Sequence, residues 1–103
     1  MSELMDYLTQ AVAEHASDLF VVAGGPVSIK TDGKLHAVSK EKVLPPQTQH
    51  LISQLYALAK RSMEEYLRCG DDDFSFAVAG LARFRVNAYR QRGSLAAVVR
   101  VVS

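Results

Sequence analysis

Between residues 74 and 88 the chain alternates apolar side chains with small or polar ones, and this alternation constrains the fold more than any other feature. A period of two is typical of a β-strand with one buried face. The pair Ala79-Gly80 predicts a turn that divides the stretch into two strands. Because successive side chains of a strand point to opposite faces, the intervening Arg83, Arg85 and Asn87 are expected to share the face away from the core. The apolar positions are Phe74, Phe76, Val78, Ala82, Phe84, Val86 and Ala88.

Short apolar segments elsewhere predict four more strands. Three of them form an antiparallel meander, and its last turn is Asp32-Gly33, the pair favoured in two-residue hairpin turns. The fourth follows a second hairpin turn at residues 91–94 and is nearly continuously apolar, interrupted only by Arg100. Such a run is typical of a central strand. The expected ranges are 19–22, 27–31, 34–38 and 95–102.

Three segments have helical periodicity instead. Ser2 is placed to cap a first helix of about 12 residues, and a second helix is expected over about 46–60. Ser62 and Glu65 have the spacing of a capping box and predict a short third helix that ends at Gly70. Its inward-facing residues are expected to be Met63, Tyr66 and Leu67.

The resulting order is α-βββ-αα-βββ, an α+β fold with an antiparallel sheet of about six strands and helices mainly on one face. A chain of 103 residues, about half of them apolar, fits one compact domain. The overall net charge is close to zero, which argues against a protein built mainly to coat nucleic acid or an acidic membrane. The average conceals an asymmetry: residues 1–73 hold seven bases and eleven acids, net −4, whereas residues 74–103 hold five arginines and no acid, net +5.

Cys69 is the only cysteine, so no internal disulfide is possible, and its sequence surroundings favour a small buried residue. The sequence starts without a basic segment ahead of an apolar run and has no stretch of 18 consecutive apolar residues. We therefore expect a cytoplasmic protein without direct membrane insertion.

Standard catalytic and cofactor motifs are missing from the sequence. It contains no phosphate-binding loop of the Gly-x-x-x-x-Gly-Lys-Ser/Thr type, no paired-cysteine zinc pattern and no His-Glu-x-x-His. His15, His36 and His50 lie far apart on different predicted elements, and Asp71-Asp72-Asp73 lacks the spacing of a calcium loop. We therefore assign no catalytic residue, no metal site and no cofactor to this chain by itself.

The arginines are different, because Arg83, Arg85 and Arg100 interrupt otherwise apolar strands, where an unpaired guanidinium would be costly to bury. One interpretation is structural: Arg83 and Arg85 lie on a solvated sheet face, or pair with acids such as Asp72 and Asp73. The other is functional: they form a fixed set of donors for a carboxylate or phosphate supplied by another domain. The pattern alone leaves both open.

Three stretches, read in order, resemble the amino-terminal domain of the PilT family of twitching-motility ATPases. The first is Ala16-Ser17-Asp18-Leu19-Phe20, followed by Gly24, Pro26 and 29–33 (Ile-Lys-Thr-Asp-Gly), with Phe20 where the family usually has His. The second is 73–76 (Asp-Phe-Ser-Phe) and 80–89 (Gly-Leu-Ala-Arg-Phe-Arg-Val-Asn-Ala-Tyr). The third runs from Gln91-Arg92-Gly93 to 99–102 (Val-Arg-Val-Val). With the helices between them, the resemblance spans residues 3 to 102.

The resemblance implies a PAS-like fold for a single amino-terminal domain of residues 1–103, and the RecA-like ATPase domain of the family is expected to be absent from this chain. In the family this domain packs against the RecA-like domains of its own and neighbouring subunits in a homo-hexamer that binds ATP and Mg. Arginines approach the nucleotide at the subunit interface, so Arg83, Arg85 and Arg100 become candidates, with Arg85 and Arg100 ahead of Arg83. Asn87 and Asp73 are candidate supporting residues.

The expected role is pilus retraction in twitching motility, in contact with the inner-membrane platform of the pilus machinery and at the inner face of the membrane. The fragment itself is expected to bind and position, not to catalyse. Two other functions remain open. One is a ligand-sensing PAS-type module, which requires a concave apolar cavity. The other is a nucleic-acid-binding domain that stacks bases on Phe84 and Tyr89, although the alternation turns Phe84 toward the core and away from the arginines. No nucleic acid is therefore expected as a partner.

Overall fold

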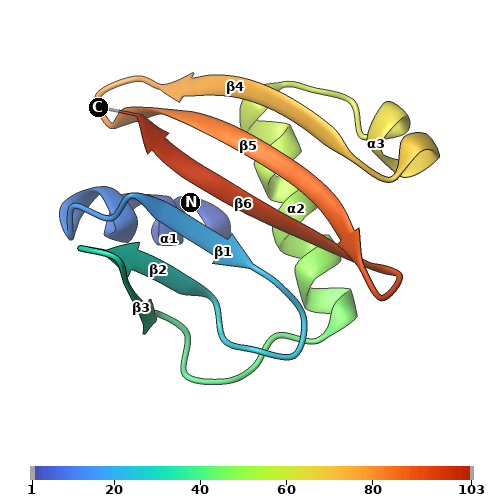
Figure 1. Ribbon diagram of the computed structural model, residues 1–103. Coiled ribbons are helices and arrows are strands. Elements are labelled where there is room, and N and C mark those ends of the chain that lie inside the picture. Colours follow the sequence, from blue (N-terminus) through green and yellow to red (C-terminus); the bar gives the residue numbers. More distant parts are fainter. Residues whose placement is uncertain (1, 103) are drawn as a thin grey trace.

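An antiparallel sheet of six strands forms one layer of the molecule, and three helices cover one of its faces (Figure 1). The computed structural model describes residues 2–102; Met1 and Ser103, the ends of the predicted domain 1–103, lie outside this range. The observed elements confirm the predicted α+β class and the order α-βββ-αα-βββ. They are α1 (Glu3–Ala13), β1 (Asp18–Val21), β2 (Ser28–Thr31), β3 (Lys34–Ala37), α2 (Pro45–Ala59), α3 (Glu64–Cys69), β4 (Asp72–Val78), β5 (Ala82–Gln91) and β6 (Ser94–Val102).

The sheet order is β3-β2-β1-β6-β5-β4, so the last strand pairs with the first and lies at the centre, as its apolar sequence predicts. The two halves are each an antiparallel meander, and the antiparallel pair of β1 and β6 joins them into one sheet. The helix α2 packs mainly on β6, and α1 packs on β1 and α2 (Figure 1). The two halves of the sheet are therefore brought side by side by the long-range pairing of β1 with β6.

Two tight turns fix the register of the β2–β3 and β5–β6 hairpins. Asp32 and Gly33 between β2 and β3 have φ angles of 50° and 77°, and Arg92 and Gly93 between β5 and β6 have φ angles of 51° and 82°. Positive φ at both central residues matches the twist of two-residue hairpins and favours glycine at the second position. Both predicted hairpin turns are confirmed.

The core lies between the sheet and the helices, and the two-residue period decides which strand residues enter it. On β5, Phe84 and Ala88 are fully buried and Val86 nearly so, whereas Arg83, Arg85 and Asn87 are exposed. The predicted face assignment for this strand is thus confirmed. The helices contribute fully or almost fully buried side chains to the same core, namely Leu4, Leu8, Leu51, Ile52, Leu55, Tyr56 and Tyr66.

The helix ends agree with the sequence except around α3. Ser2 caps α1 by accepting a hydrogen bond from the Met5 backbone N–H at 3.1 Å, as predicted. The predicted capping box of α3 is wrong: Ser62 Oγ accepts from the Glu64 backbone N–H, and the Glu65 carboxylate accepts from Arg68 instead.

The burial predicted for α3 is also wrong at two positions. The helix is only six residues long and directs one large side chain, Tyr66, into the core. Leu67, expected to face inward, is 49% exposed, and Cys69, expected to be buried, is exposed. In so short a helix only the side chain that faces the core is covered, and the side chains on its outer face stay exposed to solvent.

Candidate functional site

The sheet face opposite the helices, called the open face below, carries a row of charged residues across its central strands. Cross-strand partners in an antiparallel sheet lie on the same face. The register pairs Arg85 with Arg100, Arg100 with Asp18, and Asp18 with Lys30, so four charges follow one another from β5 to β2. Ser75 of β4 lies opposite Arg85 and extends the row.

A hollow of about 360 Å³ lies on the open face beside this row. It contains Arg85 and Arg100 together with both predicted supporting residues, Asn87 and Asp73. Asn87 pairs with Asp73 across β5 and β4, and its amide donates a hydrogen bond of 2.9 Å to the Asp73 carboxylate. Four of the five candidate residues therefore meet in one place although they come from three strands.

Arg83 is the candidate that the structure sets apart. It lies on the same face as Arg85 but faces a different hollow, about 850 Å³ and largely apolar, at the end of the sheet near the turn between β4 and β5. The C-terminal end of α1 and the last residues of β6 complete that hollow. This hollow contains none of the other four candidates.

The two central arginines differ in their ionic partners. The Nε atom of Arg100 lies 3.7 Å from an Asp18 carboxylate oxygen, and the Arg100 side chain remains 68% exposed. Arg85 is exposed and forms no ion pair with any residue of the described range 2–102, and the same holds for Arg83. The hollow thus contains one loosely paired guanidinium and one without an acidic partner.

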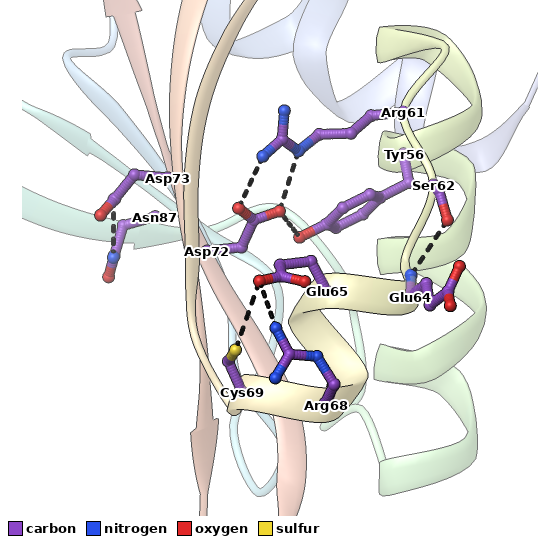
Figure 2. A network of polar contacts seen from close by, with 10 residues as sticks. All are labelled: Tyr56, Arg61, Ser62, Glu64, Glu65, Arg68, Cys69, Asp72, Asp73 and Asn87. Atoms are coloured by element: carbon purple, nitrogen blue, oxygen red, sulfur yellow. Dashed lines mark hydrogen bonds and ion pairs between the residues drawn. The ribbon is translucent and has the colours of Figure 1, made fainter.

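The interpretation in which Asp72 or Asp73 neutralises Arg83 and Arg85 is wrong, because these two acids lie on opposite sides of β4 and are both engaged elsewhere. Figure 2 shows Asp73 with Asn87 on one side of the strand and Asp72 with Arg61 and Tyr56 on the other. Arg61 donates two hydrogen bonds to Asp72, at 2.9 and 2.8 Å, and the Tyr56 hydroxyl donates a third at 2.8 Å.

This Asp72 network ties the end of α2 and the following loop to β4. The Arg61 guanidinium holds the pKa of the Asp72 carboxyl below its ordinary value, against the opposing effect of burial. Burial and the hydrogen bond to Asp72 raise the pKa of Tyr56, so its hydroxyl stays protonated and remains a donor. Arg61 also stacks over the Phe74 ring at 4.9 Å from its centroid. The network supports the strand from which Asp73 and Ser75 reach the hollow.

Chemically, Arg85 and Arg100 offer the hollow donors for an anion, and the same lining holds two acids, Asp18 and Asp73. Guanidinium groups provide planar pairs of N–H donors that match carboxylate and phosphate oxygens. Sequence reasoning missed Asp18 and Ser75 as parts of this site, because their place beside the arginines depends on the strand pairing β1·β6 and β4·β5. Within residues 2–102 no cluster of three or more metal-binding side chains occurs, and no helix is long and apolar enough to cross a membrane.

The comparisons with known proteins point to one family. No family model matches the chain. It is 35% identical over 101 residues to the type IV pilus retraction ATPase PilT of Pseudomonas aeruginosa, covering 97% of this chain and 28% of that protein. It is 31% identical over 98 residues to the type IV pilus ATPase PilU of the same organism, covering 95% of this chain and 25% of that protein. The chain therefore spans about a quarter of the length of these relatives.

Solved structures show the same relationship. The crystal structure of the pilus retraction motor PilT with bound ADP matches with a TM-score of 0.81 and 31% identity, over 100% of this chain and 29% of that one. The ATPase DotB of Legionella pneumophila shares the fold, with a TM-score of 0.72 at 20% identity over 96% of this chain and 28% of that one. In sequence and in fold, this chain is homologous to the type IV pilus ATPases PilT and PilU over about a quarter of their length, and its match to the solved PilT structure is consistent with the amino-terminal domain of that protein.

Proposed function

We propose that this domain packs against the ATPase domain of a neighbouring subunit in a hexameric pilus retraction motor and presents Arg85 and Arg100 to the nucleotide at that interface. The observation that carries the proposal is that these two exposed arginines lie opposite each other in a hollow of the open face. Within the described residues, the only ion pair that either of them forms is the one between Arg100 and Asp18. The relatives are named as pilus ATPases, and the solved PilT structure has bound ADP.

The chemistry of phosphoryl transfer explains why two such arginines would be useful. Negative charge develops on the transferred phosphoryl group and the leaving phosphate, and preorganised donors in a site shielded from water stabilise it. ATP and Mg would be held by the ATPase domain, and Arg85 and Arg100 would supply charge from the neighbouring subunit. The domain itself binds and positions, and its movement against its partner during turnover is the mechanical step.

The same proposal covers the cellular setting. The motor acts in the cytoplasm at the inner face of the membrane, where the inner-membrane platform of the pilus machinery is its partner. Nucleic acid is not a partner in this proposal, because Phe84, the aromatic residue nearest the arginines in sequence, is fully buried and cannot stack on a base.

The test uses the complete ATPase that contains this domain. Arg85→Ala and Arg100→Ala should each lower ATP turnover by roughly two orders of magnitude if the arginine contacts phosphate in the transition state. Arg83→Ala, which alters the other hollow, should have a smaller effect. Melting temperature and hexamer content are measured for every variant, so that a loss of fold or assembly is recognised.

Arg68→Ala is the matched control, because Arg68 is an equally exposed arginine on α3 that pairs with Glu65. It should turn over ATP at the normal rate. Normal turnover in both Arg85→Ala and Arg100→Ala would end the proposal. Loss of turnover together with a large fall in melting temperature would assign the arginines to the stability of the fold.

A further inference from the structure

Asp18 occupies an unusual place in the charged row of the open face. Its register partners are Arg100 on one side and Lys30 on the other, so it is the one acid among the four charges. Its side chain is only 13% exposed, whereas Arg100 beside it is 68% exposed. A carboxylate withdrawn from water in this way is costly unless hydrogen bonds and a counter-charge compensate it.

Both oxygens of the Asp18 carboxylate have neighbours that compensate it. The Ser17 hydroxyl donates a hydrogen bond of 2.7 Å to Oδ2. The other oxygen, Oδ1, faces Nε of Arg100 at 3.7 Å, which is an ion pair without a hydrogen bond. Ser17 is itself anchored, since its backbone N–H donates to the Lys30 carbonyl at 2.8 Å and its carbonyl accepts from Val101 N–H at 2.9 Å.

The atom of Arg100 that faces Asp18 is important for the site. Nε is the inner nitrogen of the guanidinium, next to the aliphatic stem, and the two Nη atoms lie at the outer edge. Within residues 2–102 these Nη atoms have no hydrogen-bond partner. An acid held at the Nε side therefore restrains the stem and leaves the outer pair of donors available for an incoming anion.

We propose that Asp18 is a positioning residue for Arg100: it holds the guanidinium by its Nε side so that the Nη edge is presented to the oxyanion at the subunit interface. The inference rests on the proposed function for the identity of that oxyanion, a phosphate of the neighbour's nucleotide. Arg85 has no such acid, so the two arginines differ: Arg100 is held in place before the anion arrives and Arg85 is ordered on binding. Asp18 itself does not touch the anion.

The positioning is tested first on the 103-residue chain, without nucleotide. The Nε–H signal of Arg100 is compared by ¹⁵N NMR in the wild type and in Asp18→Asn, together with its exchange rate with water. We expect Asp18→Asn to move this signal to the position of a freely solvated arginine and to accelerate its exchange. Asp32→Asn is the matched control, because Asp32 is an exposed acid in the β2–β3 turn. Its backbone is left-handed, a conformation that asparagine tolerates. An unchanged Arg100 signal in Asp18→Asn overturns the proposal.

The consequence for turnover is tested by a double-mutant cycle in the complete ATPase. Asp18→Asn should lower turnover by roughly 2- to 10-fold, the lower part of the range for coupled neighbouring residues, and Asp18→Glu should recover part of the loss. In the Arg100→Ala background, Asp18→Asn should have no further effect. Melting temperatures identify variants that lose turnover by losing the fold.

The outcomes separate the two proposals. If Arg100→Ala lowers turnover but Asp18→Asn adds its full effect in that background, or has none alone, the positioning role is wrong and the proposed function stands. If Arg85→Ala and Arg100→Ala both turn over normally, the proposed function fails and the phosphate-presenting role of Asp18 fails with it. In that case the NMR comparison still decides whether Asp18 orders Arg100.

Discussion

Arg85 and Arg100 stand directly opposite each other on neighbouring strands of the open face. Like charges in this position destabilise a sheet. The size of the effect is comparable to the stabilisation by a favourable cross-strand pair, roughly 0.2–1 kcal/mol. Asp18 offsets the charge of Arg100 only loosely, at 3.7 Å, and Arg85 forms no ion pair within residues 2–102. The folded chain therefore contains an unfavourable pair of charges at the site that we propose binds the nucleotide phosphates.

Removing one of the two charges should stabilise the chain. We expect Arg85→Gln, which keeps most of the side-chain length, to raise the free energy of unfolding by about 0.2–1 kcal/mol at low salt. The gain should shrink in 1 M salt, where the Debye length is only about 3 Å. Urea denaturation at both salt concentrations measures it. Arg68→Gln, which removes a charge already paired with Glu65, should not stabilise; a loss of stability in Arg85→Gln would contradict the repulsion.

The chain alone should not turn over ATP. Its sequence lacks a glycine-rich loop of backbone donors for phosphate, and its two central arginines offer side-chain charge only. A steady-state phosphate-release assay on the 103-residue chain should remain at background. Turnover above background that survives further purification and is abolished by Arg85→Ala would show that the domain has its own activity.

Lysine should not replace Arg100 in the complete ATPase. Its single ammonium keeps the charge but lacks both the planar pair of outer donors and the separate Nε–H that faces Asp18. Arg100→Lys should therefore remain impaired in turnover while its melting temperature stays near that of the wild type. Full activity in this variant would indicate that only the charge of Arg100 matters.

Lowering the pH should weaken the Asp72 network and with it the stability of the fold. The pKa of Asp72 in the folded chain lies below its ordinary value, chiefly because Arg61 hydrogen-bonds to the carboxylate. Its contribution to stability is therefore present above the unfolded pKa of about 3.9 and is lost as the pH falls through the folded pKa. Arg61→Ala should raise the pKa of Asp72 and move the midpoint of acid unfolding to higher pH.

Circular dichroism between pH 2 and 6, together with the carboxyl ¹³C shift of Asp72, gives both quantities. Arg68→Ala serves as the control, because the Arg68–Glu65 pair is exposed on both sides and should leave the midpoint unchanged. If the midpoint of acid unfolding does not move in Arg61→Ala, the ionisation of Asp72 does not contribute to the acid stability of the chain.

Two substitutions at Tyr66 should separate its hydroxyl from its ring. The side chain is fully buried, its hydroxyl donates to the Tyr89 carbonyl at 2.7 Å, and its ring stacks on Tyr56 with centroids 5.6 Å apart. Tyr66→Phe should cost about 0.5–1.5 kcal/mol through the lost hydrogen bond, and Tyr66→Ala about 3–5 kcal/mol through the cavity. Equal losses measured by urea denaturation would mean that the ring contributes nothing beyond its hydroxyl.

Local sequence patterns predicted the strands and helices well, because alternation, capping and hairpin turns act over a few residues. The two-residue period correctly buried Phe84 and exposed Arg85, and Asp32-Gly33 and Arg92-Gly93 correctly marked the tight turns. The errors lie in α3, where Leu67 and Cys69 are exposed because only tertiary packing decides how much of so short a helix is covered.

The composition of the site was harder to predict than its central residues. The alternation placed Arg85 on the open face, and the two-residue turn at Arg92-Gly93 sets the register in which Arg100 lies opposite it, but nothing local could show that Asp18 lies on the other side of Arg100. The pairing of β1 with β6 joins segments from the two ends of the chain, and its register is set by burial of Leu19 and Val99 in the common core. The ion-pair partner of Asp72 could not be predicted locally either, because Arg61 approaches it from the loop after α2.

The tight turn between β5 and β6 also limits how this family of sequences can change in length. Its two central residues, Arg92 and Gly93, connect strands whose register sets Arg85 against Arg100. One inserted residue that no bulge absorbs would shift β6 by one position, turning Arg100 toward the helices and Val99 toward solvent. The site therefore depends on the number of residues between the two arginines as well as on the arginines themselves, and we expect a relative with one residue more or fewer in this hairpin to lack the same site.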